Sequence, residues 1–146
     1  MSLKVRIKSA NPEFLPKYQT EGSAGMDLHA LLDKPIVLKP MERKLIPTGI
    51  FVELPNGLEA QIRSRSGLAS KNGVIVLNAP ATIDSDYRGE YGVMLINLGG
   101  KDYTLSNGDR IAQLVVAKYE KVEWELVVGI SANTSRATKG FGSTGV

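Results

Sequence analysis

The sequence of 146 residues contains no cysteine and a single histidine, His29. The lack of cysteine excludes disulfides, thiolate zinc sites and cysteine nucleophiles. With one imidazole, a zinc site built on several histidines is impossible, and a Ser-His-Asp triad would have to use His29. No apolar run approaches the roughly 18 residues that indicate a membrane span. Residues 1–7 alternate charged and apolar side chains, unlike a signal peptide. We therefore expect a cytoplasmic protein with no membrane partner.

Excess charge of one sign is also small. Lysine and arginine number 18 against 15 aspartate and glutamate residues, which gives a formal net charge of +3. The basic residues do not cluster, so we expect no nucleic-acid partner, whereas a small anionic ligand stays open. With so little histidine and no cysteine, the general base of any catalysis is expected to be an aspartate or glutamate. Any metal would be an ion that prefers oxygen ligands, such as Mg²⁺.

The dominant period of the sequence is two. Polar and apolar residues alternate in three segments, which predicts half-buried strands at 4–8, 58–63 and 122–126. Continuous apolar runs predict strands covered on both faces at 74–77, 93–96 and 114–117. Asn-Gly pairs, which favour tight turns, stand at 56–57, 72–73 and 107–108. Many short strands separated by turns predict an all-β fold: a sandwich, a jelly roll or a barrel.

Helix is scarce in this pattern. We predict one short helix over 66–71, with Ser66 as its N-cap and the pair Asn72-Gly73 at its end. Residues 131–146 differ from the rest, because they are rich in Gly, Ser and Thr and contain no acidic residue. We therefore predict one β domain over 1–130 and a mobile C-terminal tail over 131–146.

The tail contains the pattern G-x-G-x-x-G at 140–145. A dinucleotide site would need a strand before this pattern and a helix after it, and Val146 alone follows, so we do not expect one. Two interpretations stay open. The tail is a disordered terminus, or it is a flap whose glycine amides, with Arg136, Ser143 and Thr144, wrap an anion while Phe141 covers a flat ring.

Three other stretches carry polar groups that could serve a binding site. Arg65, Ser66 and Gly67 would present a guanidinium, a hydroxyl and backbone amides together, although an ordinary capped turn with a surface arginine is the alternative. Gln113 is an amide among apolar residues and must find partners if it is buried, although an ordinary Asp-Arg surface pair at 109–110 with a satisfied glutamine is the alternative. Asp27 could contact a metal-bound water, or it is an outward carboxylate of a strand.

The segment 78–90 lies between two apolar runs and is predicted to be a long hairpin. A carboxylate such as Asp84, near a bound anion and a metal ion, could activate water. Tyr87 offers a flat face to a sugar or ring, and the amide of Asn78 could read a base edge. The alternative is an Asp-Ser-Asp turn with a tyrosine packed behind it.

Taken in order, five segments resemble the motifs of the homotrimeric deoxyuridine triphosphate nucleotidohydrolases, the dUTPases. The segments are AGMDLHA (24–30), RSGLAS (65–70), NAPATIDSDYRGE (78–90), GDRIAQL (108–114) and GFGSTG (140–145). The resemblance implies an all-β fold, a β-clip or jelly-roll-like barrel with one short helix and a flexible C-terminal tail. It also implies hydrolysis of dUTP to dUMP and pyrophosphate, with Mg²⁺ on the triphosphate. This reaction limits uracil incorporation into DNA and supplies dUMP for dTMP synthesis. Three subunits would build each site jointly.

The resemblance also assigns roles to residues. Asp84 would orient and deprotonate the water that attacks the α-phosphorus, and Tyr87 would lie under the deoxyribose and leave no room for a 2′-hydroxyl. The uracil would be read by Asn78 and by the backbone around Thr82, Ile83 and Asp84. The phosphates would be held by Arg65, Ser66, Gly67 and Gln113. The tail would add Arg136, Phe141, Gly142 and Ser143, and Asp27 would act on the metal through water.

Some positions depart from the family pattern. Ser64 stands where the family usually has proline, Ala81 where it often has glycine, and Ala137 and Lys139 where the tail usually has two glycines. Two rival functions remain. One is a deoxycytidine triphosphate deaminase, or a bifunctional relative, which shares the fold. The other is a non-catalytic module that binds nucleotide or a protein partner, in which a water-activating Asp84 would have no use.

Overall fold

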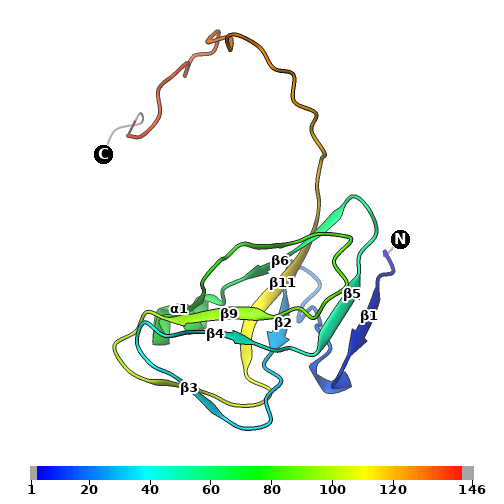
Figure 1. Cartoon of the computed structure of the whole chain (residues 1–146), viewed down its shortest axis with the longest axis vertical. Helices are drawn as coiled ribbons and strands as arrows, with labels where there is room; N and C mark the ends of the chain where they lie inside the picture. The colour runs from blue at the N-terminus through cyan, green and yellow to red at the C-terminus, as the bar shows by residue number, and fades with distance from the viewer. Residues whose placement is uncertain (1–2, 143–146) are drawn as a thin grey trace.

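The structure is a computed structural model and describes residues 3–142. These residues form an all-β molecule with one α-helix and one 3₁₀ turn (Figure 1). The elements in chain order are β1 (Arg6–Ser9), η1 (Pro12–Phe14), β2 (Met26–His29), β3 (Ile36–Leu38), β4 (Arg43–Ile46), β5 (Ile50–Glu53), β6 (Leu58–Arg63), α1 (Ser66–Asn72), β7 (Val74–Val76), β8 (Ala81–Ile83), β9 (Val93–Asn97), β10 (Tyr103–Leu105) and β11 (Arg110–Lys118). The predicted all-β class is confirmed, and so is the single short helix.

The strands form four antiparallel sheets around one core. The largest has the order β2-β11-β6-β8, and a second has the order β4-β9-β7. Two-stranded pairs, β1 with β5 and β10 with β3, complete the jelly-roll-like fold. Both larger sheets contribute to the same core, since Leu28 and Ile62 of the first and Val93 and Leu95 of the second belong to one buried cluster. The two sheets therefore pack across a shared apolar interior, as expected for layered β proteins.

The predicted long hairpin is confirmed. β7 and β9 pair antiparallel, with Val74 opposite Asn97 and Val76 opposite Leu95. The connection between them does not stay on this sheet, because β8 pairs with β6 of the four-stranded sheet, with Ile83 opposite Ala60. The segment 78–90 is thereby held at the edge of the larger sheet.

The helix α1 follows β6 directly. Its N-cap is Arg65, which makes no side-chain capping bond, so the prediction that Ser66 caps the helix is wrong by one residue. The predicted end is confirmed: Gly73 adopts a left-handed conformation with φ 68° and its N–H donates to the carbonyl of Ala69. A Cβ at position 73 would lie 2.6 Å from the backbone nitrogen of Gly99, so both the conformation and the space require glycine.

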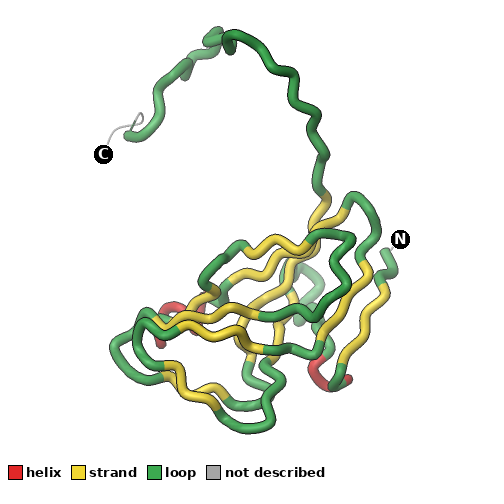
Figure 2. Tube along the Cα trace, viewed as in Figure 1, coloured by secondary structure: helices red, strands yellow, loops and turns green. Residues whose placement is uncertain are grey.

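The last strand ends at Lys118, and residues 119–142 contain no helix or strand. Figures 1 and 2 show this segment leaving the body beyond β11 and running away from it. The strand predicted at 122–126 is therefore wrong for the single chain. Trp124 is 89% exposed and Leu126 is 99% exposed, so the alternating pattern finds no partner strand and no apolar surface within this chain. The part of the chain that is described, residues 3–142, has no helix both long and apolar enough to cross a membrane.

Candidate active site

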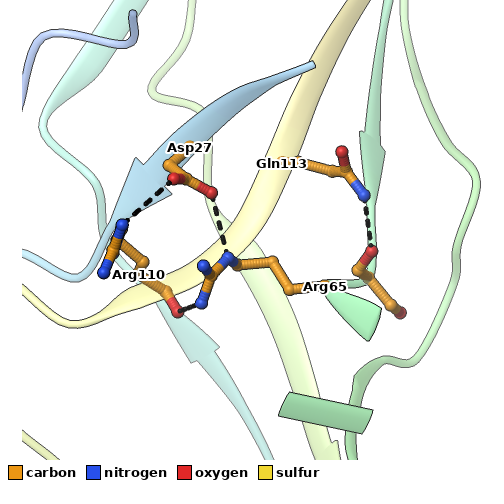
Figure 3. Close-up of polar contacts among 5 residues, drawn as sticks. Asp27, Arg65, Arg110 and Gln113 are labelled. Carbon is orange, nitrogen blue, oxygen red and sulfur yellow. Dashed lines mark hydrogen bonds and ion pairs between the residues drawn. The ribbon is translucent and has the colours of Figure 1, made fainter. Parts of the chain in front are cut away.

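Asp27, Arg65 and Arg110 form a cluster of charged side chains at one end of β2 and β11 (Figure 3). The Arg65 Nε donates to Asp27 Oδ1 at 2.9 Å, and its Nη1 donates to the backbone carbonyl of Arg110 at 3.1 Å. The Arg110 Nη1 lies 3.7 Å from Asp27 Oδ2. The Asp27 side chain is 15% exposed and the Arg65 side chain 30% exposed, so the pair is screened less than a surface pair. Two fixed bonds orient the Arg65 guanidinium while its Nη2 keeps donors for an anion.

Strand register brings Gln113 next to this cluster. Gln113 lies opposite Asp27 on β2 and opposite Arg63 on β6. Its Nε2 donates to the Ser64 carbonyl at 2.9 Å. A Cβ at Gly25 would lie 2.5 Å from the Gln113 Oε1, so glycine at position 25 makes room for this amide. The predicted need for a partner is met by Ser64, and Figure 3 shows Gln113 beside Arg65 and Asp27.

Ser64, which replaces the proline usual in the family pattern, has a structural function here. Its Oγ accepts a hydrogen bond from the backbone N–H of Val76 at 2.9 Å. Its carbonyl accepts the bond from Gln113. This residue therefore links β7 to the segment before α1, and a proline could not accept the first of these bonds through a side chain.

The lone histidine lies near the same cluster. His29 follows Asp27 by two residues on β2, so the two side chains share a face of the strand. Its ring stacks on Phe14 with a centroid distance of 5.3 Å, and its Nδ1 is buried without a partner among residues 3–142. Burial lowers the pKa of His29 below 6.5, and the neighbouring Asp27 only partly opposes this shift. A neutral imidazole at pH 7 adds no charge to the cluster.

A cavity of about 230 Å³ lies elsewhere on the molecule and is lined by residues that the sequence singled out in the segment 78–90. Its lining includes Asn78, Thr82, Ile83, Asp84 and Tyr87. All five lie within residues 78–87, and the pairing of β8 with β6, with Ala81 opposite Ile62, adds Ile62 of the larger sheet to the same lining. The Asp84 side chain is exposed to the cavity side of the molecule rather than buried in the core. A carboxylate in that position is available to a ligand and to water.

Tyr87 folds back over its own loop. Its hydroxyl donates to the carbonyl of Glu90 at 3.1 Å, and its backbone N–H donates to the carbonyl of Asp84 at 3.2 Å. A Cβ at Gly89 would collide with the Tyr87 hydroxyl oxygen, so the ring can reach this position because residue 89 is glycine. The ring of Tyr91 lies behind it with a centroid distance of 6.3 Å, and burial raises the pKa of Tyr91 to about 12.

The tail residues do not reach either cluster in the single chain. The Arg136 Nε donates to the carbonyl of Lys139 at 3.0 Å, and the Phe141 side chain is fully exposed. Gly142 has φ 73° and is exposed. Ser143, which was predicted to bind the substrate, lies outside the described residues. The predicted site residues thus form three separate groups. A cavity lined by Arg65, Gly67 and Arg110 shares no lining residue with the cavity that holds Asp84.

Several contributors were not apparent in the sequence. Arg110 was interpreted as one half of a possible surface pair with Asp109, but its carbonyl binds Arg65 and its guanidinium faces Asp27. Its position opposite His29 follows from the pairing of β11 with β2, which no local pattern reveals. Glu90 and Thr48 were also not identified, and both support the loop that carries Tyr87.

The carboxylates within residues 3–142 do not form a metal cage. Within residues 3–142, no group of three or more His, Asp or Glu side chains is arranged to hold an ion. Asp27 Oδ2 has one long contact, to Arg110, and retains acceptor capacity. This donor set fits an oxygen-preferring ion that is bound mainly by other ligands, with at most water-mediated help from Asp27.

The fold and these residues define a class: a jelly-roll-like β protein with an Arg65–Asp27–Arg110 cluster on one part of its surface and, on another, a concave surface that carries an amide, an exposed carboxylate and a tyrosine ring. The dUTPase family model matches residues 12–145. The chain belongs to the dUTPase family.

Named relatives agree with this assignment. The chain is 56% identical over 148 aligned positions to the deoxyuridine 5′-triphosphate nucleotidohydrolase of Orientia tsutsugamushi (strain Ikeda), with 99% of each chain covered. It is 59% identical to the protein of the same name from Anaplasma marginale (strain St. Maries), with 97% of this chain and 95% of that one covered. The solved structure of the Staphylococcus bacteriophage 80alpha dUTPase with dUPNHPP matches with a TM-score of 0.84 at 26% identity, covering 99% of this chain and 100% of that one.

Proposed function

We propose that this chain hydrolyses dUTP to dUMP and pyrophosphate with Asp84 as the base, in a site that several copies of the chain complete. Membership of the dUTPase family makes the chain a dUTP nucleotidohydrolase. The observation that carries the proposed site is the single cavity lined by Asn78, Thr82, Ile83, Asp84 and Tyr87. A base reader, a flat ring and an exposed carboxylate on one surface suit a deoxyuridine nucleotide.

Recognition of uracil would use the amide of Asn78 and the backbone of β8. Uracil presents an acceptor at position 4 and a donor at position 3, whereas cytosine reverses this pattern. A cytosine in the same place would leave buried polar groups unpaired, at about 1–3 kcal/mol for each group. Tyr87 would lie against the deoxyribose, where its ring excludes a 2′-hydroxyl. The position of Tyr87 at the cavity wall supports this role.

The chemical step would be attack of a water molecule on the α-phosphorus. Asp84 would orient this water and take its proton as the new P–O bond forms, and the bond to the β-phosphate oxygen breaks to release pyrophosphate. Arg65, Ser66, Gly67 and Gln113 would hold the phosphates in line. Such positioning and charge neutralisation account for most of the rate enhancement in phosphoryl transfer, so a cysteine or histidine is not needed.

Dependence on Mg²⁺ is general in the dUTPase family. The ion, when bound to the triphosphate, neutralises negative charge that develops on the phosphate oxygens. We propose that the phosphates of the substrate supply most of its ligands, and that Asp27 acts through water. The paired but not saturated carboxylate of Asp27 supports this role.

We propose that the working form is a homotrimer with shared sites, located in the cytoplasm. Two features support assembly. The predicted site residues fall into three groups that do not meet in one chain. The extension beyond β11 also exposes Val122, Trp124, Leu126 and Ile130, and apolar side chains in such a row favour burial against another subunit.

Purified protein with Mg²⁺ and each of dUTP, dCTP, dTTP and UTP provides the test. We expect pyrophosphate from dUTP, far less from the other three nucleotides, and no ammonia. Ammonia released from dCTP would identify a deaminase instead. Binding of dUTP without turnover would identify a non-catalytic binding module.

Arg65→Lys is expected to lower kcat/KM for dUTP by about 10- to 100-fold. A lysine cannot donate to Asp27 and to the Arg110 carbonyl while it also presents a planar group to phosphate. Steady-state release of pyrophosphate measures the effect. The matched control is Arg63→Lys, because among residues 3–142 the exposed side chain of Arg63 hydrogen-bonds to Gln61 alone. Equal losses in both variants would contradict a specific role for Arg65.

A further inference from the structure

The position of Tyr87 is set by polar contacts more than by packing. The side chain is 46% exposed. It lines the cavity of about 230 Å³ described above and also a second cavity, of about 350 Å³, bounded by Leu45, Pro47 and Glu90. A ring with open space on two sides is not confined by close-packed neighbours. The position of the ring at the wall of the 230 Å³ cavity must therefore depend on what anchors the loop that carries it.

The residue that anchors this loop is Glu90, which accepts the hydrogen bond from the Tyr87 hydroxyl. The backbone carbonyl of Glu90 accepts this hydrogen bond at 3.1 Å. The Glu90 side chain reaches across to the turn before β5, where one carboxylate oxygen, Oε1, accepts from the Gly49 N–H at 2.7 Å and from the Thr48 N–H at 3.2 Å. A carboxylate that accepts two backbone N–H bonds holds its own backbone in one place.

The next residue is tied to the same turn. The Thr48 hydroxyl donates to the carbonyl of Tyr91 at 2.5 Å, and the Tyr91 N–H donates to the carbonyl of Ile50 at 2.8 Å. Thr48 and Tyr91 are each 1% exposed, so this end of the anchor belongs to the core. The ring of Tyr91 then supports Tyr87 from behind, at a centroid distance of 6.3 Å. The exposed ring of Tyr87 is thereby connected to the rigid body through residues 90 and 91.

We infer that Glu90 is a positioning residue: by fixing the loop that carries Tyr87, its carboxylate sets how strictly the site distinguishes dUTP from UTP. The inference rests on the proposed function, in which Tyr87 excludes the 2′-hydroxyl. Glu90 also lines this cavity, but its carboxylate is bonded to the N–H groups of Thr48 and Gly49, so in this scheme it acts on the substrate through Tyr87. Without the carboxylate, the backbone carbonyl of Glu90, which accepts the hydrogen bond from the Tyr87 hydroxyl, is free to move. The ring then no longer blocks the space beside the 2′ carbon.

The test is the ratio of kcat/KM for dUTP to kcat/KM for UTP. We expect Glu90→Ala to reduce this ratio by about tenfold or more, because small misplacements of a contact residue have large effects on discrimination. Glu90→Gln retains a carbonyl oxygen that can accept both N–H bonds, so it should keep the ratio within about threefold of the wild type. Glu53→Ala, at an exposed glutamate paired with Arg6, is the matched control and should leave the ratio unchanged. Should the alanine variant fail to fold, Glu90→Asp, which shortens the reach of the carboxylate, should show the same loss.

A double-mutant cycle separates positioning from a general structural role. If Glu90 acts through Tyr87, then Glu90→Ala should have no further effect on the ratio in a Tyr87→Ala background. An unchanged ratio in Glu90→Ala, a loss of the ratio in Glu90→Gln equal to that in the alanine variant, or a further loss in the double variant would overturn the inference. If the wild type does not prefer dUTP over UTP, the proposed function itself fails. A wild type with that preference and an unaffected Glu90→Ala refutes the positioning role alone.

Discussion

Asp84→Asn is expected to abolish most turnover of dUTP while nucleotide binding persists. The amide has the size of the carboxylate and can still accept a hydrogen bond from water, but it cannot take the proton of that water. General base catalysis contributes about 10²- to 10⁴-fold to rates, so kcat should fall within that range. Pyrophosphate release measures kcat, and calorimetric titration with dUPNHPP measures binding. The dissociation constant should change by less than about threefold, because the cavity lining is otherwise unaltered.

The neighbouring carboxylate supplies the control for this substitution. Asp86 is exposed, lies two residues further along the same loop, and does not line the cavity that holds Asp84. Asp86→Asn should therefore retain kcat within about threefold of the wild type. Full turnover in Asp84→Asn would remove Asp84 from its role as base. Equal losses in the two variants would indicate a general charge effect instead.

Removal of residues 136–146 should lower kcat/KM for dUTP by about 100-fold or more while the β body remains folded. Arg136 and Phe141 make no contact with the body in the single chain, so their loss should not change the melting temperature. In the proposed site they reach the phosphates and the base, and loss of one preorganised donor alone costs about 10²- to 10³-fold in rate. Light scattering after gel filtration should still report a trimer, because residues 119–135 with Trp124 are retained. A truncated protein with full activity would contradict the flap.

Two point variants separate the contributions of Arg136 and Phe141 to the loss of activity on truncation. Arg136→Ala should mainly raise KM through the lost phosphate contact, and Phe141→Leu should have a smaller effect through the lost ring.

Ala137 adopts φ 47°, in the left-handed region that an L side chain occupies at a cost of about 1–2 kcal/mol. This residue replaces a glycine of the usual family tail, and the backbone conformation that glycine would favour is retained.

Much of the fold could be predicted where the pattern is local. The strand at 58–63 was predicted with the bounds that the structure has, and so was the glycine that ends α1. The flanking runs of the long hairpin were predicted too, because continuous apolar segments separated by turn residues have few other solutions. The segment 122–126 carries the same alternating signal as 58–63 but forms no strand here, since alternation predicts a strand only where a partner edge exists.

The sequence by itself determined which chemical groups this protein can use: an aspartate base, arginine and amide donors, one imidazole and no thiol, set in motifs of one family. Those are properties of single residues and short spacings. The tertiary structure alone decided which of them meet. The pairing of β8 with β6 places the segment 78–90 beside Ile62, which helps line its cavity, and the pairing of β11 with β2 places Arg110 against Asp27. Contacts between distant segments depend on the free energy of the whole packed core, and no local pattern contains that information.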